Sequence, residues 1–398
     1  MSKKVLIITQ NFYPVIGSAG NRMKNIFQLL NEHNIETTVL TTEPAYPNKV
    51  LYKNEKFWDD ATLNGETKKI IRIPINKKKY SNRIVGRLLF YLEIMIRFAM
   101  SLWSLRKNKF DIIYVSTPPI FIVGSAFFGK IVNKSKLILE VRDLWPDSLI
   151  GVNTFNNKAI VNIFRILEKS MYKQADFIVI NSMGFKNHIK RHLKGKNTPL
   201  IYLPNGPRQN EIVKAKRSDG EFTVVYTGNL GLAQDIDRLK LISKLLHQKK
   251  IHFEVIGYGF WTEEFKIFLN ENKLSSVHVR QPTTRKESLE LIENSDVAIA
   301  FLNDKDVFST VLPGKVIDYM TCKTPIIAGV KGIAAETIIE NNIGFVFERD
   351  DMQGMIRQIE ELKKDANLMK QLEENCLSTV KTKFLWDNNI ENLLEILT

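Results

Sequence analysis

Short apolar runs alternate with longer segments of mixed polarity along almost the whole chain. In the first half the runs cover residues 5–9, 37–41, 111–115, 136–140, 177–181 and 200–203. In the second half they cover residues 222–226, 252–256, 277–280, 297–301, 325–328 and 344–347. Runs of this length, separated by stretches long enough for a helix, are typical of buried parallel strands with crossover helices. We therefore predict an α/β protein with two Rossmann-like, doubly wound domains that face a central cleft.

A polar and charged stretch separates the two series of runs. It covers residues 207–220 and follows Pro204, Asn205 and Gly206, which interrupt regular structure. A chain of 398 residues is also too long for one typical core. We predict a first domain over 1–206, a linker over 207–220, a second domain over 221–383, and a terminal helix over 384–398 that packs back on the first domain.

The segment 81–110 has an unusual distribution of polar side chains. At about 100° per residue they fall within one narrow arc, and the rest of the circumference is apolar. These polar residues are Arg83, Arg87, Glu93, Arg97, Ser101 and Ser104. The charges inside the apolar run argue against a helix that spans a membrane. Two interpretations remain: a helix buried between the sheet and its neighbours, or a helix partly in a membrane surface with Lys77–Lys79 on lipid headgroups.

Positive charge is concentrated in the first half of the chain. Residues 1–200 carry a net charge of +18, whereas the remaining residues carry −4. This asymmetry predicts an anionic partner for the first half: membrane phospholipid, a pyrophosphate-bearing acceptor or nucleic acid. The aromatic residues there lie in apolar periodic runs rather than between basic residues, which disfavours nucleic acid. We therefore expect an anionic membrane surface as a partner, and no nucleic acid.

The cysteine content and the first residues bear on the compartment. Cys322 and Cys376 have neither CxxC nor metal-ligand spacing, which is typical of a reducing cytoplasm. The chain starts with a short strand rather than the long apolar segment of a signal peptide. Together with the charge, these features predict a peripheral or monotopic protein at the cytoplasmic face of the cell membrane.

Glycine-containing loops follow the first strand of each series. A loop of this kind between a strand and a helix lets the backbone approach a ligand closely. In the first half the loop contains Gly17 and Gly20, with Arg22 just before a helix that we expect from Met23. The corresponding residues of the second half are Gly228, Asn229, Gly231 and Gln234, and Gly257 follows the next strand. Each loop alone is a weak signal, because neither is a GxGxxG fingerprint or a P-loop.

The stretch from Ser309 to Gly329 combines a turn, a basic side chain and a carboxylate. Pro313 and Gly314 favour a tight turn, and Lys315 follows at the start of a predicted short helix. Helix N-termini attract phosphate, and a lysine adds a full charge. Asp318, one turn later, can accept hydrogen bonds from a ribose diol. The stretch therefore predicts a nucleotide diphosphate site, although a surface helix with an ordinary lysine and aspartate remains an alternative.

Charged side chains also gather after the strand 136–140. The sequence EVRDLWPDS, from Glu140 to Ser148, contains Arg142, Asp143 and Trp145. In open α/β sheets ligands bind beyond the carboxyl ends of the strands, so these residues are candidates for the chemistry. The alternative is a salt-bridged loop that caps a helix.

The order of these features resembles that of GT-B glycosyltransferases, specifically the GT4 group. The resemblance covers nearly the whole chain, and its motifs are specific in combination rather than singly. Residues 140–148 and 227–234 (TGNLGLAQ) are similar to one branch, the bacterial N-acetyl-L-fucosaminyltransferases of O-antigen and capsule assembly. The resemblance implies that a sugar passes from a nucleotide sugar, UDP-linked, to a saccharide on a polyprenyl diphosphate. It implies no cofactor.

The resemblance also implies roles for individual residues. Lys315 and the backbone N–H groups of Gly228–Gly231 would stabilise the leaving diphosphate, and Asp318 would hold the ribose. In the first domain Asp143, or in second place Glu140, would deprotonate or orient the acceptor hydroxyl. The acceptor pyrophosphate would be met by Arg142, near Gly17, Gly20 and Arg22.

The sequence departs from the usual pattern of the family in two motifs. Of two glutamates separated by seven residues, the first position is Thr310 and the second is Asp318, so the acid expected at the donor sugar is absent. A basic pair often found after the first strand of the second domain is replaced by Asn229 and Gln234. Diphosphate binding would then rely on Lys315, the helix N-termini and Arg285. Because the motif is altered, a GT-B epimerase or a non-catalytic partner subunit is the alternative function.

Metal ligation is not expected from the sequence. The motif from Asp304 to Asp306 is similar to the DxD motif of another glycosyltransferase fold, but GT-B enzymes generally need no metal for the donor. His188 and His192 are four residues apart in a strongly basic helix, so we expect them on its solvated face.

Overall fold

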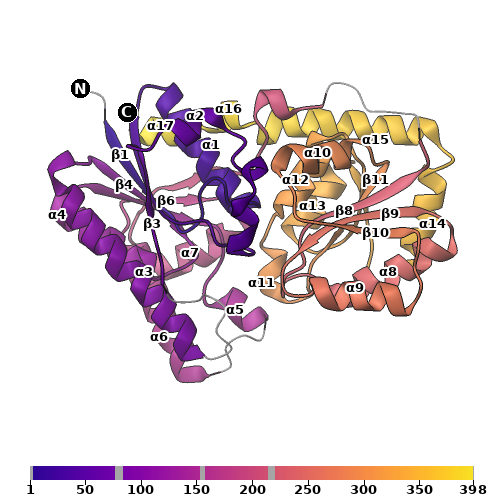
Figure 1. Cartoon of the computed structure of the whole chain (residues 1–398), viewed down its shortest axis with the longest axis horizontal. Coiled ribbons are helices and arrows are strands. Elements are labelled where there is room, and N and C mark those ends of the chain that lie inside the picture. The colour runs from indigo at the N-terminus through magenta and orange to yellow at the C-terminus, as the bar shows by residue number, and fades with distance from the viewer. Residues whose placement is uncertain (1–2, 77–83, 153–156, 214–219, 398) are drawn as a thin grey trace. The chain divides into compact units, whose positions relative to one another are not determined.

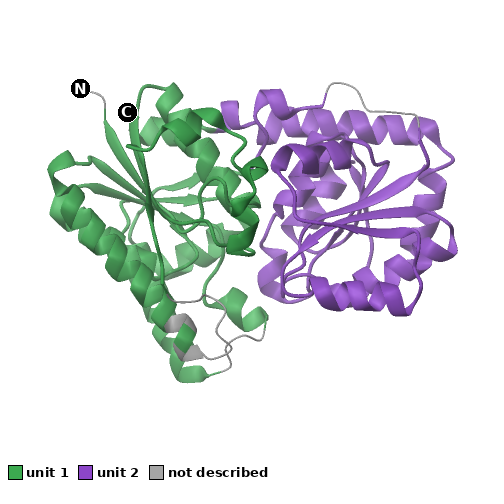
Figure 2. Ribbon diagram, viewed as in Figure 1, with its two compact units in different colours: residues 1–204, 390–398 green, residues 205–389 purple. Residues whose placement is uncertain are grey.

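The computed structural model describes residues 3–76, 84–152, 157–213 and 220–397. The chain divides into two compact units (Figure 2): unit 1 contains Met1–Pro204 and Ile390–Thr398, and unit 2 contains Asn205–Asn389. Each unit is built on one parallel β-sheet surrounded by helices (Figure 1). The last residues of the chain therefore belong to unit 1. The chain returns to this unit at residue 390, whereas the prediction placed that return at 384.

Unit 1 has a seven-stranded sheet in the order β3-β2-β1-β4-β5-β6-β7. Its strands are β1 (Lys4–Ile8), β2 (Glu36–Thr42), β3 (Ile70–Ile73), β4 (Ile112–Thr117), β5 (Lys136–Val141), β6 (Phe177–Ile180) and β7 (Leu200–Tyr202). Its α-helices are α1 (Ser18–Glu32), α2 (Ala61–Gly65), α3 (Ile84–Leu105), α4 (Ile122–Asn133), α5 (Asp147–Gly151), α6 (Lys158–Gln174), α7 (Lys186–Leu193) and α17 (Glu391–Leu397). The central strand β1 pairs on both sides, with Val5 between Thr37 and Ile112.

Unit 2 has a six-stranded sheet in the order β10-β9-β8-β11-β12-β13. Its strands are β8 (Thr223–Asn229), β9 (His252–Tyr258), β10 (Val277–Arg280), β11 (Val297–Phe301), β12 (Ile326–Gly329) and β13 (Gly344–Val346). Its α-helices are α8 (Ile236–Gln248), α9 (Thr262–Glu271), α10 (Arg285–Glu293), α11 (Asp306–Ser309), α12 (Gly314–Thr321), α13 (Ile333–Glu340), α14 (Met352–Leu362), α15 (Ala366–Thr379) and α16 (Trp386–Asn389). A short π-helical turn, η6 (Val380–Phe384), joins α15 to α16.

The strand order locates the crevices of the two sheets. In both, the first strand is third from one edge of the sheet, and the chain then winds outward in two directions. The order reverses next to β1 in unit 1 and next to β8 in unit 2. At such a switch point the loops after neighbouring strands diverge and leave room for a ligand. The predicted α/β class with two Rossmann-like parallel sheets is confirmed.

Helix α1 begins earlier than the sequence predicted. We expected it from Met23, but Gly17 is its N-cap residue, and Gly20 lies in its first turn. Gly17 has a φ of 92°, which favours glycine. A Cβ atom on Gly20 would lie 2.0 Å from the carbonyl oxygen of Val15, so this glycine lets the loop fold against its own helix. The space left by the missing side chain of Gly20 is therefore occupied by the protein's own backbone at Val15.

Helix α3 has one buried apolar face and one exposed apolar face. Its buried face packs in the unit with Phe90, Ile94, Phe98 and Leu102 at intervals of four residues. A second apolar face is exposed and consists of Leu89, Leu92, Ile96, Met100 and Trp103. Lys77–Lys79 and Arg83 lie outside the described residues. Within the described ranges no helix is both long and apolar enough to cross a membrane.

Candidate active site

Lys315 lies at the switch point of the unit 2 sheet. It occupies the first turn of α12, and its Nζ donates a hydrogen bond to Oε1 of Gln234 at 3.0 Å. The same Nζ lies 3.7 Å from the centre of the Tyr226 ring on β8, and the Tyr226 hydroxyl donates to Gln234 Oε1 at 2.9 Å. Burial lowers the pKa of Lys315 to about 7. Among the described side chains no carboxylate pairs with this lysine, so it can serve an anionic ligand.

The loop after β8 brings backbone close to this lysine. A Cβ atom on Gly228 would lie 3.6 Å from Cε of Lys315, and Gly228 has a φ of 118°. The sequence-predicted partners Gly228, Gln234 and Lys315 are therefore brought together. Their combination of a cation, a neutral amide and an open backbone is suited to a phosphate group.

Asn229 and two other predicted glycines have packing roles in this loop. A Cβ atom on Gly231 would lie 2.9 Å from Nδ2 of Asn229, and one on Gly259 would lie 2.1 Å from its Oδ1. Gly257 is buried in β9, where a Cβ atom would lie 2.6 Å from Leu230. These glycines make room for neighbouring side chains, and so they shape the loop that Gly228 presents.

Arg285 is held by two carboxylates. Its Nη1 donates to Oδ1 of Asp318 at 2.9 Å, and its Nε pairs with Oε1 of Glu211. Burial raises the pKa of Asp318, and the charge of Arg285 opposes this shift. Since Arg285 is already neutralised, the structure gives it the task of orienting Asp318 rather than binding diphosphate. Lys315 and Asp318 lie three residues apart on α12 and so share one side of it.

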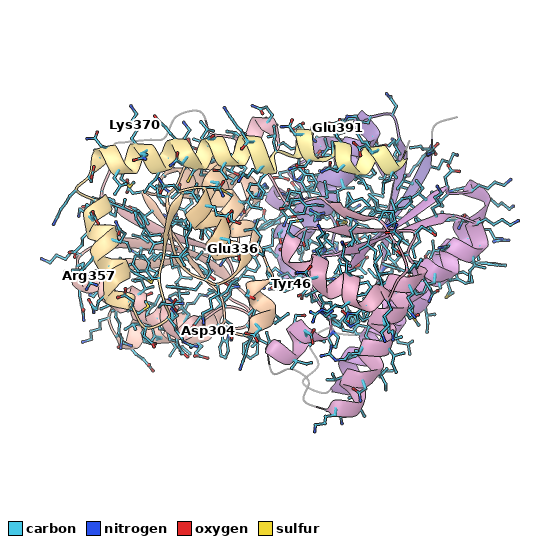
Figure 3. All side chains as sticks on the ribbon, turned by 180° about the vertical axis from the view of Figure 1, so that it is seen from behind. Tyr46, Asp304, Glu336, Arg357, Lys370 and Glu391 are labelled. Carbon is cyan, nitrogen blue, oxygen red and sulfur yellow. The ribbon has the colours of Figure 1, made fainter. Side chains whose placement is uncertain are left out.

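The side chains of Thr310 and of Asp304, in the acidic loop before it, both have partners within unit 2. The Thr310 hydroxyl donates to the carbonyl of Val307 at 2.6 Å, which places it at the end of α11. Asp304, labelled in Figure 3, pairs with Arg349 at 2.8 Å. An ion pair of this kind is typical of a solvated surface loop.

In unit 1, Glu140 and Arg22 form a buried ion pair beneath the switch point. Arg22 Nε lies 2.7 Å from Glu140 Oε1, and the side chains are 1% and 0% exposed. Tyr114 also donates to Oε1, at 2.5 Å, and Ser116 donates to Oε2. Burial raises the pKa of Glu140, but the charges of Arg22 and Arg142 and these hydrogen bonds bring it below its ordinary value. A carboxylate so fully engaged anchors α1 to β5 and is a poor general base.

Arg142 and Asp143 follow β5 and are more accessible than Glu140. Arg142 donates from Nε to the Ser116 hydroxyl at 2.9 Å, and its Nη2 lies 3.3 Å from the Pro118 carbonyl. Burial raises the pKa of Asp143 to about 6, although Ser148, the Leu144 N–H and Arg142 act in the opposite direction. A carboxyl that titrates near neutrality is suited to accept a proton.

Comparisons with known proteins agree with this geometry. Residues 207–378 match the family model of the group 1 glycosyl transferases. An uncharacterized glycosyltransferase of Methanocaldococcus jannaschii is 23% identical over 313 residues, which are 76% of this chain and 78% of the relative. The protein is a GT4-like glycosyltransferase.

Solved structures show the same fold over the full chain. The HepE protein of Anabaena, crystallised with UDP and glucose, superposes with a TM-score of 0.72 at 15% identity and covers 99% of both chains. WaaG, a glycosyltransferase involved in lipopolysaccharide biosynthesis, superposes with a TM-score of 0.67 at 13% identity and also covers 99% of both chains. At these identities the likeness establishes the GT-B fold and not the substrate.

His188 and His192 are not on a solvated face, so that expectation was wrong. His188 is 9% exposed and His192 is half-buried, because both turn toward the buried Glu168 of α6. Because α7 contains many basic side chains, its composition suggested a solvated helix and did not indicate that one side of it is buried.

Two residues that contact the candidate site in unit 2 were missed in the sequence. Tyr226 is part of an apolar run and reads as core, yet its ring lies under Lys315. Glu211 lies in the charged stretch before β8, and its contact with Arg285 spans 74 residues. The sequence did offer a signal for Tyr226, because it is a tyrosine in a buried strand. The role of Glu211 is seen only in the folded structure.

Proposed function

We propose that this glycosyltransferase moves a sugar from a UDP-linked donor to a saccharide on a polyprenyl diphosphate, at the cytoplasmic face of the membrane. The main observation in favour of a UDP-linked donor is Lys315. This half-buried lysine lies at the switch point, next to Gly228, and burial lowers the pKa of its side chain to about 7. A buried cation without an acidic partner is unfavourable until an anion arrives. HepE, which has the same fold, binds UDP.

Each donor group then has a counterpart in unit 2. The ammonium of Lys315 contacts the diphosphate and stabilises the charge that develops as the sugar leaves. Asp318 accepts hydrogen bonds from the ribose, with Arg285 holding its Oδ1 and leaving Oδ2 for the ligand. Thr310 lies where the family has a glutamate, and so it bears on the choice of donor sugar.

The acceptor half of the proposal concerns Asp143. Its carboxylate takes the proton of the acceptor hydroxyl, or orients that hydroxyl, while Arg142 contacts the acceptor pyrophosphate. Glu140 is unsuited to this role because Arg22 and the hydroxyls of Tyr114 and Ser116 occupy it. We take N-acetyl-L-fucosamine as the first sugar to test, because residues 140–148 and 227–234 resemble that branch.

The exposed face of α3 supports a peripheral membrane contact. Met100 and Trp103 are 66% and 53% exposed, and the guanidinium of Arg106 lies 4.4 Å from the Trp103 ring. Arg106, Lys107 and Lys109 are exposed directly after the helix. Apolar side chains beside basic ones are what binding to an anionic bilayer surface requires. On α6, Ile163 and Ile166 are also exposed.

A panel of nucleotide sugars tests the donor. We expect UDP and a UDP-linked sugar to raise the unfolding temperature, and radiolabelled sugar to pass to a polyprenyl-diphosphate saccharide. Lys315→Ala should abolish the shift and the transfer, whereas Lys305→Ala, at an exposed lysine of unit 2, should keep both. Conversion of the UDP-sugar without any acceptor would favour an epimerase, and no shift with any nucleotide would favour a non-catalytic subunit.

Vesicle flotation tests the membrane contact. The double variant Met100→Ser/Trp103→Ser should float less with anionic vesicles than the wild type. Phe260→Ser is the matched control, since Phe260 is 68% exposed but lies in unit 2. Equal flotation of the wild type and the double variant would contradict the proposed surface.

A further inference from the structure

Three side chains with metal-binding atoms meet between α6 and α7. Glu168 comes from α6, and His188 and His192 come from α7. One ligand atom of each lies within 4.8 Å of the others. The spacing of four residues places both imidazoles on one side of the helix, where their rings stack with centroids 4.4 Å apart. Two histidines and a glutamate are a common zinc ligand set.

The hydrogen bond of the outer ring nitrogen of His192 determines which of the two ring nitrogens carries the proton. Nδ1 lies 2.9 Å from the backbone carbonyl of His188, and a carbonyl can only accept, so Nδ1 carries the proton. In neutral His192 the lone pair is therefore on Nε2. This arrangement, with one nitrogen held by a carbonyl and the other directed inward, is typical of metal-ligating histidines.

The inward nitrogen of His192 faces a carboxylate oxygen. Nε2 lies 3.9 Å from Oε2 of Glu168, too far for a hydrogen bond. Two lone pairs that face each other repel unless a cation lies between them. A gap of this width accommodates an ion that makes two bonds of about 2.0–2.1 Å.

The two oxygens of Glu168 differ. Oε1 accepts from the Tyr172 hydroxyl at 2.9 Å and lies 2.7 Å from Nε2 of His188. Oε2 is buried without a hydrogen-bond partner among the described residues, in a side chain that is 0% exposed. An unsatisfied buried carboxylate oxygen is costly, and it points into the space between the two helices.

A second carboxylate completes the surroundings. Asp147, at the start of α5, has Oδ2 3.8 Å from Nδ1 of His188, and Arg165 holds its Oδ1 at 2.6 Å. If His188 ligates through Nε2, its proton resides on Nδ1, where Asp147 faces it. At 3.8 Å this carboxylate is too far for a hydrogen bond, but it places a negative charge beside the outer nitrogen of a metal-bound imidazole.

We propose that Glu168, His188 and His192 bind a divalent transition metal of the zinc class, with water as the remaining ligand. The ion links α6 to α7. This site lies in unit 1, apart from the residues assigned to the donor, so it does not depend on the proposed function. Its role is to stabilise the unit that carries Asp143.

Titration of the full-length, chelator-treated protein with Zn²⁺ and Co²⁺ tests the proposal. We expect one equivalent of Zn²⁺ per chain by calorimetry, a higher unfolding temperature, and visible Co²⁺ absorption bands typical of a site with four or five ligands. His192→Gln should weaken binding at least tenfold and remove the Co²⁺ bands. His33→Gln is the control, because His33 is a half-exposed histidine with one carboxylate, Glu391, at 3.8 Å.

Two results would overturn the proposal. One is the absence of saturable binding in the wild type, which would leave only a cluster of polar side chains between α6 and α7. The other is equal binding by the wild type and His192→Gln. Because Glu168 is fully buried, Glu168→Gln could fail to fold, and so the decision rests on the partly exposed His192.

Discussion

The ammonium of Lys315 lies 3.7 Å from the centre of the Tyr226 ring and has no acidic partner among the described side chains. The ring and the Gln234 oxygen satisfy it only in part, since neither carries a full negative charge. Holding the charge of Lys315 away from water therefore costs free energy, and a bound diphosphate would reduce this cost.

Replacing Lys315 should weaken the binding of nucleotide diphosphate. Lys315→Met keeps the aliphatic stem on the Tyr226 ring but removes the charge, and the loss of a charge-assisted contact costs about 1.5–3 kcal/mol, or roughly 10- to 150-fold in Kd. Calorimetric titration with UDP measures this change. Lys305→Met should bind UDP like the wild type, and wild-type affinity in Lys315→Met would show that the diphosphate binds elsewhere.

Binding should also take up a proton. Since the pKa of Lys315 is lowered to about 7, the free lysine is mostly neutral above that pH, and a bound diphosphate raises the pKa again. Affinity should therefore fall as the pH rises above about 7, by up to about tenfold per pH unit. Titrations between pH 7.5 and 9, in buffers of different ionisation enthalpy, measure the uptake. Lys315→Met should show none, and a wild type without uptake would contradict the assignment.

Asp143→Asn should separate activity from stability. Burial raises the pKa of Asp143 to about 6, so above that pH the folded protein holds a buried carboxylate that lowers its stability. Asparagine should leave the unfolding temperature at pH 7.5 unchanged or higher, while transfer falls by about 10²–10⁴-fold. In the wild type kcat/KM should rise as the pH passes through about 6. Asp59→Asn, at an exposed aspartate of the same unit, should change neither property.

Glu140→Gln should destabilise unit 1. Breaking its ion pair leaves Arg22 buried without a counter-charge, which costs about 3–5 kcal/mol. Because the folded pKa of Glu140 is lowered, the stabilisation is present above the ordinary glutamate pKa and is lost as the pH falls below it. Urea unfolding measures the change. The exposed pair Lys4–Glu36 is the control, and Glu36→Gln should cost less than about 1 kcal/mol.

The strands were predictable because their signal is local. The apolar run 297–301 coincides with β11, and the run 222–226 appears as β8, displaced by one residue at its start and three at its end. Lys315 and Asp318 were also identified, since a turn and a helix start are encoded by neighbouring residues. The contacts that decide their roles were not, because Arg285 reaches Glu211 and Asp318 only through the folded sheet. His188 was misjudged for the same reason: its partner Glu168 lies 20 residues away on another helix.

The return of the chain to unit 1 at Ile390 has a consequence for biosynthesis. Ile390, Leu393 and Leu397 are almost fully buried, and Asn392 donates to the Tyr202 carbonyl at 3.2 Å. On the ribosome, the first sheet must therefore wait for nearly the whole polypeptide to emerge before this apolar surface is covered. A stop codon before residue 390 would expose it permanently, so that loss of the last few residues is expected to cause degradation of the entire protein.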